Sequence, residues 1–164
     1  MNPSDATTPA RDVLLAYFGE LREIEEESLN ALGGPKALLR DDPPSSSDED
    51  FDRFLARTEA VRARYCSPAL ANAQRGVSVV VSWPLAHDPS SIRILAETEK
   101  RPGTVVIRTS EGSDMAFLRQ YTLEQTNDEW RIVSEKELGL DESVRPPDRG
   151  IRGTLGRLFG GRSS

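Results

Sequence analysis

The sequence is poor in the residues from which metal and redox sites are built. It has one cysteine, Cys66, and one histidine, His87, among 164 residues. A lone cysteine excludes an internal disulfide and a multi-cysteine metal site, and one distant histidine does not complete a ligand set. The glycine-containing residues 153–156 lack the lysine of a phosphate-binding loop. We therefore predict that the chain has no metal site and needs no cofactor.

Long apolar runs are also missing. No stretch approaches the ~20 apolar residues that cross a bilayer, and residues 1–5 lack the basic and then apolar pattern of a signal peptide. Hydrophobic residues make up 37% of the chain and charged residues 29%, which is typical of a polar globular domain with one modest core. With a single free cysteine, the reducing cytoplasm is the simplest expected location.

The net charge of −6 is unevenly distributed. From residue 145 onward the chain has five arginines and one aspartate, so this end carries +4 and the preceding residues carry −10. An acidic body repels nucleic acid and attracts basic proteins, although acidity also serves solubility alone. We predict a flexible basic tail over residues 139–164, since glycines interrupt any helix there. Ile151, Leu155, Leu158 and Phe159 would share one helical side, a weak signature of membrane or partner contact.

The first half of the chain has helical periodicity. Thr8-Pro9 predicts a helix start, and residues 33–35, Gly-Gly-Pro, predict its end. Ser47 is placed to cap a second helix, and residues 69–73 predict a short third one. The apolar stripe of the first helix is Val13, Leu14, Tyr17, Phe18, Leu21 and Ile24. That of the second is Phe51, Phe54, Leu55, Thr58, Val61 and Tyr65.

After Gly76 the period changes to two. Strands are predicted over residues 77–83, 92–98, 104–109, 115–125 and 130–138. Short turns between successive strands require antiparallel neighbours. The fold class is therefore α+β: two or three N-terminal helices packed on a curved antiparallel sheet, in a domain spanning residues 9–138 after a short tail of residues 1–8. Alternation places Ile92, Ile94, Ala96 and Thr98 on one side of their strand. It likewise places Phe117, Arg119, Tyr121 and Leu123 on one face.

The order of these elements resembles the NTF2-like superfamily. Residues 121–133, a strand ending at a polar turn with Trp130 beginning the next, look like its closing hairpin. Trp83-Pro84 and the hairpin at residues 97–103 resemble the NTF2-fold immunity proteins of bacterial polymorphic toxin systems. The resemblance implies a cone in which a curved sheet wraps the first helix and leaves a concave mouth. Trp130 and Ile132 would then point toward the core.

The resemblance implies a non-catalytic immunity protein that binds and neutralises a cognate bacterial toxin. An acidic surface would meet a basic cleft of the toxin, and an exposed aromatic residue would anchor the contact. Simpler roles stay open for the acids, as the solvated side of a helix or as part of a linker. The candidate partner-binding residues are Glu25, Glu26, Asp41, Asp42 and Trp83.

The alternative is a small-molecule binder, or a dehydratase- or isomerase-type enzyme, that uses the cone cavity. Arg119 and Tyr121 are the cavity candidates, and an inward arginine either holds a ligand carboxylate or pairs with a protein acid. His87 precedes Asp88, but adjacent residues rarely orient one another, so we interpret it as an ordinary loop histidine. A polar cavity with an acid beside His87 or Arg119 would favour this alternative. A third hypothesis is an assembly module that forms a homodimer, because NTF2-like domains often pair through their sheets.

Overall fold

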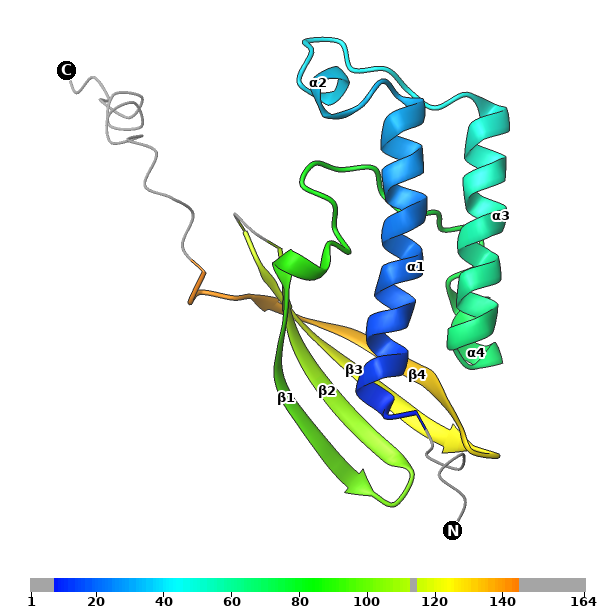
Figure 1. Ribbon diagram of the computed structural model, residues 1–164, viewed down its shortest axis with the longest axis vertical. Coiled ribbons are helices and arrows are strands. Elements are labelled where there is room, and N and C mark those ends of the chain that lie inside the picture. Colours follow the sequence, from blue (N-terminus) through cyan, green and yellow to red (C-terminus); the bar gives the residue numbers. More distant parts are fainter. Residues whose placement is uncertain (1–7, 113–114, 145–164) are drawn as a thin grey trace, which may run out of the picture.

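The computed structural model describes residues 8–112 and 115–144. The described chain is α+β, with its helices before an antiparallel sheet, as predicted (Figure 1). The helices are α1 (Ala10–Ala31), α2 (Pro35–Leu38), α3 (Asp48–Tyr65), α4 (Pro68–Ala73) and the 3₁₀ helix η1 (Pro89–Ser91). The strands are β1 (Ile92–Arg101), β2 (Thr104–Glu111), β3 (Phe117–Thr126) and β4 (Glu129–Leu140). None of the helices in these two ranges is long and apolar enough to span a membrane.

Helix α1 forms around the predicted apolar stripe. Leu14, Phe18 and Leu21 recur at the spacing of one helical face and are buried. Pro9 itself occupies the N-cap position, and no side chain caps this end within the described residues, so the predicted Thr8 cap is wrong. The helix ends near Gly34, which has a positive φ of 84°. The amide of Gly34 donates a hydrogen bond to the carbonyl oxygen of Leu29 at 2.9 Å.

Helix α3 lies alongside α1. Its start is the predicted one, because the Ser47 hydroxyl accepts the amide of Asp50 at 3.1 Å. Glu20 of α1 and Arg64 of α3 form an ion pair at 2.6 Å across the two helices. Phe51 was predicted to be buried but is 47% exposed, because the buried stripe of α3 begins one turn later at Phe54.

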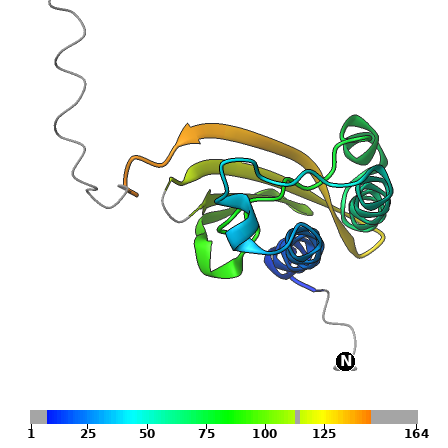
Figure 2. The same ribbon diagram turned by 90° about the horizontal axis from the view of Figure 1, so that it is seen from above.

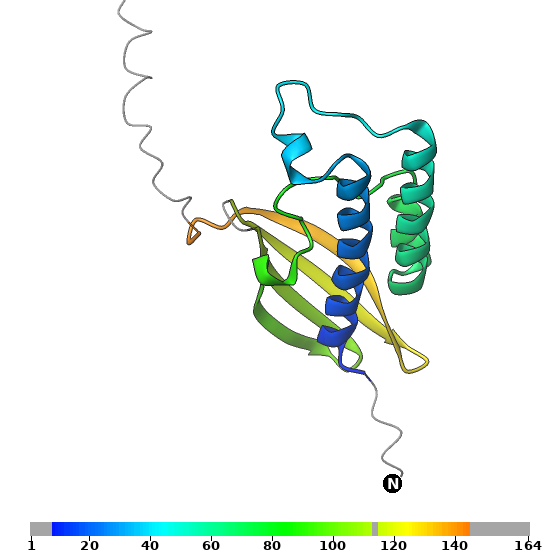
Figure 3. The ribbon, with the colours of Figure 1, turned by 45° about the horizontal axis from the view of Figure 1, so that its top comes forward.

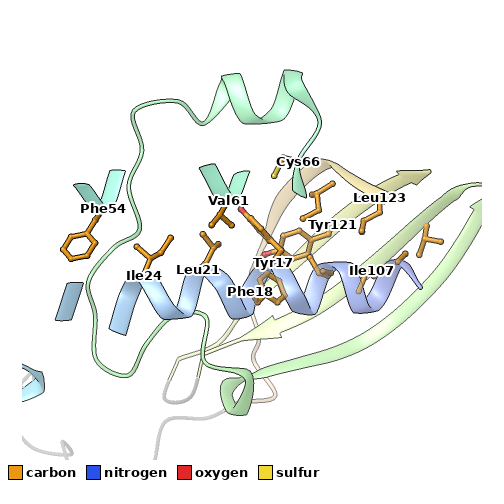
Figure 4. Close-up of a cluster of buried hydrophobic side chains, with 14 residues drawn as sticks. Tyr17, Phe18, Leu21, Ile24, Phe54, Val61, Cys66, Ile107, Tyr121 and Leu123 are labelled. Atoms are coloured by element: carbon orange, nitrogen blue, oxygen red, sulfur yellow. The ribbon is translucent and has the colours of Figure 1, made fainter. Parts of the chain in front are cut away.

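The sheet is a meander in which each strand pairs with the next, in the order β1-β2-β3-β4. It curves around α1, which crosses its concave face (Figure 2). Opposite residues such as Ile107 and Tyr121, or Leu123 and Ile132, pair on this inner face. Ile132 is buried as predicted, and Trp130 packs at the edge of the core. Figure 4 shows Ile107, Tyr121 and Leu123 of this face close to side chains of α1 such as Phe18.

Register shifts interrupt the strand pairing at four places, two on β1 and two on β4, and one on each strand decides which side chains face the core. The register passes from Ile94 to Ala96 on β1 while β2 advances by one residue, so Leu95 is an extra residue. Ile92 and Ile94 therefore face the core, whereas Ala96 and Thr98 lie on the opposite face of the sheet. The prediction that all four residues share one side of the strand is wrong.

The bulge on β4 has a larger effect on the inner face. Val133 is the extra residue there, because Leu123 pairs with Ile132 and Thr122 pairs with Ser134. Beyond the bulge, Glu135 is opposite Tyr121 and Glu137 is opposite Arg119. Both glutamates therefore share the inner face with Ile132, although strict alternation from Ile132 would have turned them outward.

Residues 77–83 form no strand, which contradicts the prediction. Their valines have high β-propensity, but propensity reflects packing against neighbouring strands, and this segment pairs with none in the described sheet. Val79 packs against the core instead, while Val80 is exposed. The segment passes behind α1 on its way from α4 to η1 (Figure 3).

The described domain also continues beyond the predicted boundary at residue 138. Strand β4 runs to Leu140, and the amide of Asp141 donates to the carbonyl oxygen of Ala116 at 2.7 Å. The Asp141 carboxylate accepts hydrogen bonds from Ser110 of β2 and from Ser143. Ordered structure thus covers part of the predicted tail. The basic residues from Arg145 onward and the predicted N-terminal tail at residues 1–7 lie outside the described residues.

Candidate functional site

A cavity of about 520 Å³ lies between α1, α3, the segment at residues 77–87 and the strands β2, β3 and β4. Leu21, Val79 and Phe117 contribute apolar walls, and the remaining lining includes several ionisable side chains. Its volume falls within the range of small-molecule sites, which are mostly apolar and carry a few convergent polar groups.

Arg119 projects into this cavity from β3, as predicted. Its Nη1 atom donates to Oε1 of Glu135 at 3.0 Å, and its Nη2 lies 3.6 Å from Oε2 of Glu137. Its Nε lies 3.5 Å from Oε2 of Glu111. Burial works against the charged guanidinium, yet the neighbouring carboxylates, Glu111 first, raise the pKa of Arg119. Of the two roles considered for an inward arginine, the structure shows pairing with protein acids.

Glu111 and Tyr121 form the floor of this cluster. Glu111 is buried at the end of β2. Its Oε1 accepts hydrogen bonds from the hydroxyl of Tyr121, at 2.8 Å, and from the hydroxyl of Thr109, at 2.6 Å. Tyr121 is buried on the inner face, and its burial together with the Glu111 charge raises its pKa. The phenol therefore stays protonated and keeps donating to Glu111. Tyr121 acts here as part of a fixed polar network.

A second polar group joins α1 to the segment at residues 77–87. Glu25 is 1% exposed, so it is not one of the surface acids among which the sequence placed it. One carboxylate oxygen accepts the backbone amide of His87 at 3.1 Å, and the other bonds to Nδ1 of the same residue. The Asp88 carboxylate instead accepts the amide of Ser90 at the start of η1.

This pairing changes the interpretation of His87. A carboxylate bound to Nδ1 fixes the orientation of the imidazole and leaves Nε2 as the nitrogen available to a ligand. The ring lines the cavity and stacks near Phe18, with 5.7 Å between ring centroids. His87 is therefore an oriented imidazole at the edge of a cavity, which can accept or donate a proton.

Arg62 is the second arginine at the cavity, and it was not among the residues predicted from the sequence. It is 8% exposed, and its Nη1 donates to the backbone carbonyl oxygens of Gln74, at 3.1 Å, and Val77. Gln74 in turn donates through Nε2 to Glu135 at 3.1 Å. Arg62 thus connects α3 to the start of the irregular segment, as we call residues 77–87.

Several buried polar atoms at the cavity have no hydrogen-bond partner. Among the residues that the structure describes, four buried side-chain atoms lack one, and three of these belong to cavity-lining residues. They are Nε of Arg62, Nε of Arg119 and Oε1 of Gln74. Buried polar atoms are nearly always hydrogen-bonded in native proteins, so this concentration marks the cavity as a place that accommodates further polar groups.

The other predicted partner-binding residues do not line the cavity. Glu26, Asp41 and Asp42 are exposed, and Trp83 is 56% exposed. Glu26 lies 3.7 Å from Arg22 on the same helix, which is the surface pairing expected of a solvated helix side.

Cys66 is buried, as interpreted from the sequence. Burial raises the pKa of its thiol to about 11, which disfavours the reactive thiolate. No cluster of three or more histidine, cysteine, aspartate or glutamate side chains suited to a metal occurs in the described ranges.

Comparison of the chain with protein-family models, with curated proteins and with solved structures gives no match. The functional conclusion therefore rests on the geometry of the cavity.

The tyrosines predict how stability depends on alkaline pH. Burial is the main cause that raises the pKa values of Tyr17, Tyr65 and Tyr121, and these are the only tyrosines of the sequence. An unfolded tyrosine ionises near pH ~10. Because folding favours the protonated phenols, their contribution to stability is complete below pH ~10 and is lost as the pH rises further.

We expect the folded protein to show less tyrosinate absorbance at pH ~10 than the urea-unfolded chain, which is half ionised there. The free energy of unfolding should decrease steadily above that pH. Spectrophotometric titration of both states and urea unfolding at several alkaline pH values measure this. Normal ionisation of all three phenols in the folded protein would contradict their burial.

Proposed function

We propose that this protein binds a small molecule in the cavity between α1 and the inner face of the sheet. The observation that carries the proposal is one cavity of about 520 Å³ at which two lining side chains, Arg62 and Gln74, each have a buried polar atom without a hydrogen-bond partner. A ligand with polar groups and an apolar body would satisfy these atoms and cover Leu21 and Val79.

The architecture supports an NTF2-like cone. A long first helix lies across the concave face of a curved antiparallel sheet (Figure 2). The cavity is lined by residues of both this helix and the sheet. The resemblance implies that enzymes of this superfamily work inside the cone. An acid beside His87 or Arg119 favours the small-molecule hypothesis, and the structure has both: Glu25 lies beside His87 and Glu111 beside Arg119.

The pair of Glu25 and His87 supports proton transfer to or from the ligand. An imidazole oriented by a carboxylate is suited to act as a general acid or base. A dehydratase- or isomerase-type reaction is the class that such a pair would serve. The buried free thiol of Cys66 supports a cytoplasmic location for this protein.

Binding of small molecules can be tested with the full chain and a library of polar fragments, using ligand-observed NMR. We expect several fragments to bind. Ser78 lines the cavity from the irregular segment, so a Ser78→Trp variant should fill the space and abolish binding. Ser45→Trp places the same ring on an exposed loop and should leave binding unchanged. Absence of binding, or binding that Ser78→Trp does not affect, would count against the proposal.

The immunity-protein hypothesis is a second candidate, favoured by the exposure of Trp83 and of Asp41 and Asp42. Exposed tryptophans are frequent anchors of protein interfaces. If a toxin is encoded beside this gene, co-expression should restore growth, and Trp83→Ala should weaken the complex. Failure of the wild-type chain to bind such a toxin would contradict this hypothesis without touching the first.

A further inference from the structure

Arg62 is a buried cation that lacks an ion-pair partner. It is 8% exposed on α3, and within the described ranges no carboxylate oxygen lies within 4.0 Å of its guanidinium. Its hydrogen bonds go from Nη1 to two backbone carbonyl oxygens, which carry no net charge. Its Nε is buried without a partner. Buried charges in proteins are normally paired with an opposite charge. We therefore expect a negatively charged group to pair with Arg62.

The carboxylates of the cavity do not supply this charge. Glu25 is bound to His87, and Glu111 accepts from Tyr121 beside Arg119. Glu135 is shared between Arg119 and the side-chain amide of Gln74. Each acid lining the cavity therefore already has a donor of its own.

The second cavity arginine cannot take an anion from a ligand. Three glutamates lie within 3.6 Å of Arg119, so its positive charge is more than balanced. An anion placed there would be repelled by these carboxylates. Arg62 is left as the cation available to an anionic group in the cavity.

The surroundings of Arg62 narrow the chemistry of this group. Tyr17 and Gln74 line the cavity with it, and the raised pKa of Tyr17 keeps its hydroxyl protonated as a donor. Oε1 of Gln74 is an acceptor without a partner, which suits a hydroxyl or amine hydrogen next to the anion. Leu21 and Val79 provide apolar contact for the remainder of the ligand.

We propose that Arg62 is the anion-binding residue of the cavity and that the ligand is an organic acid whose carboxylate pairs with it. A planar guanidinium matches a carboxylate geometrically, with two parallel N–H donors. This inference rests on the proposed small-molecule function and adds the charge of the ligand to it.

The test uses the full chain and three pairs of probes, each an acid and its neutral amide: acetate and acetamide, butyrate and butyramide, benzoate and benzamide. Affinities are measured by NMR titration at fixed ionic strength. We expect at least one acid to bind ~10-fold more tightly than its amide, a difference typical of one charge-assisted contact. The Arg62→Met variant should lose this preference while its affinity for the amide is retained. Arg75→Met, which removes an exposed arginine just after α4, should behave as the wild type.

Equal affinities of acids and amides for the wild type would overturn the assignment of Arg62 and leave the cavity as a binding site for neutral molecules. An acid preference that persists in Arg62→Met would overturn it as well. Binding of no fragment of any charge would contradict both this inference and the proposed function.

If Arg62→Met does not fold, the wild type decides the question. The acid should shift the Nε–H resonance of Arg62 and its amide should not, whereas an unmoved resonance at saturation overturns the inference.

Discussion

Replacing Phe18 by alanine is expected to lower the free energy of unfolding by about 3–5 kcal/mol. Phe18 is 1% exposed and lies where α1 meets the sheet. Its ring meets that of Tyr121 edge to face, with 5.3 Å between centroids, and also lies beside His87. The variant loses this contact and leaves a void that the fixed strands of the sheet cannot close.

Phe51→Ala is the matched control, because it removes the same side chain from an exposed position on α3. Its effect should stay within about 0.5 kcal/mol. Urea unfolding followed by circular dichroism measures both variants. Similar losses in the two would contradict the orientation of α1 and α3 that the structure assigns.

Replacing Arg119 by methionine is expected to cost about 3–5 kcal/mol, because it leaves a buried carboxylate without its cation. Glu111 is the acid concerned: it is buried, while Glu137 is exposed and can be solvated. The hydroxyls of Tyr121 and Thr109 still donate to Glu111 in this variant, but they carry no compensating charge.

A double-mutant cycle with Glu111→Gln separates the lost ion pair from lost packing. Glutamine keeps the shape of the side chain and removes its charge, so Arg119→Met should cost much less in the Glu111→Gln background. We expect a coupling of about 1–3 kcal/mol between the two positions. Additive effects would show that Arg119 stabilises the protein through its aliphatic stem alone.

The helices and the class of the fold follow from the sequence because their signals are local. The stripe of Leu14, Phe18 and Leu21 and the Ser47 cap each depend on residues within a turn or two. The strands are harder, because a bulge depends on the partner strand. The alternation of residue types around Leu95 and Val133 does not indicate that either is an extra residue. Each bulge nevertheless decides which side chains of its strand face the core.

The candidate site was predictable in part. Alternation placed Arg119 and Tyr121 on the inner face correctly. Glu25 follows Leu21 by four residues and precedes the buried Ser28 by three, so all three lie on the same face of the helix. The helical period alone would therefore have predicted that Glu25 is buried. Its partner His87 could not be found this way, since tertiary folding alone brings them together. Arg62 was missed because its lack of a counter-charge is visible only in three dimensions.

The chain order of the elements has a consequence for biosynthesis. Helix α1 leaves the ribosome before the sheet does, but the inner-face residues that cover its apolar stripe lie on β2, β3 and β4. Helix α3 can shield one side of that stripe early, through contacts such as Glu20 with Arg64. The remainder stays open to solvent until residues 105–132 have been translated. Between the synthesis of α1 and that of β4, the nascent chain therefore exposes an amphipathic helix, the kind of apolar surface to which chaperones bind.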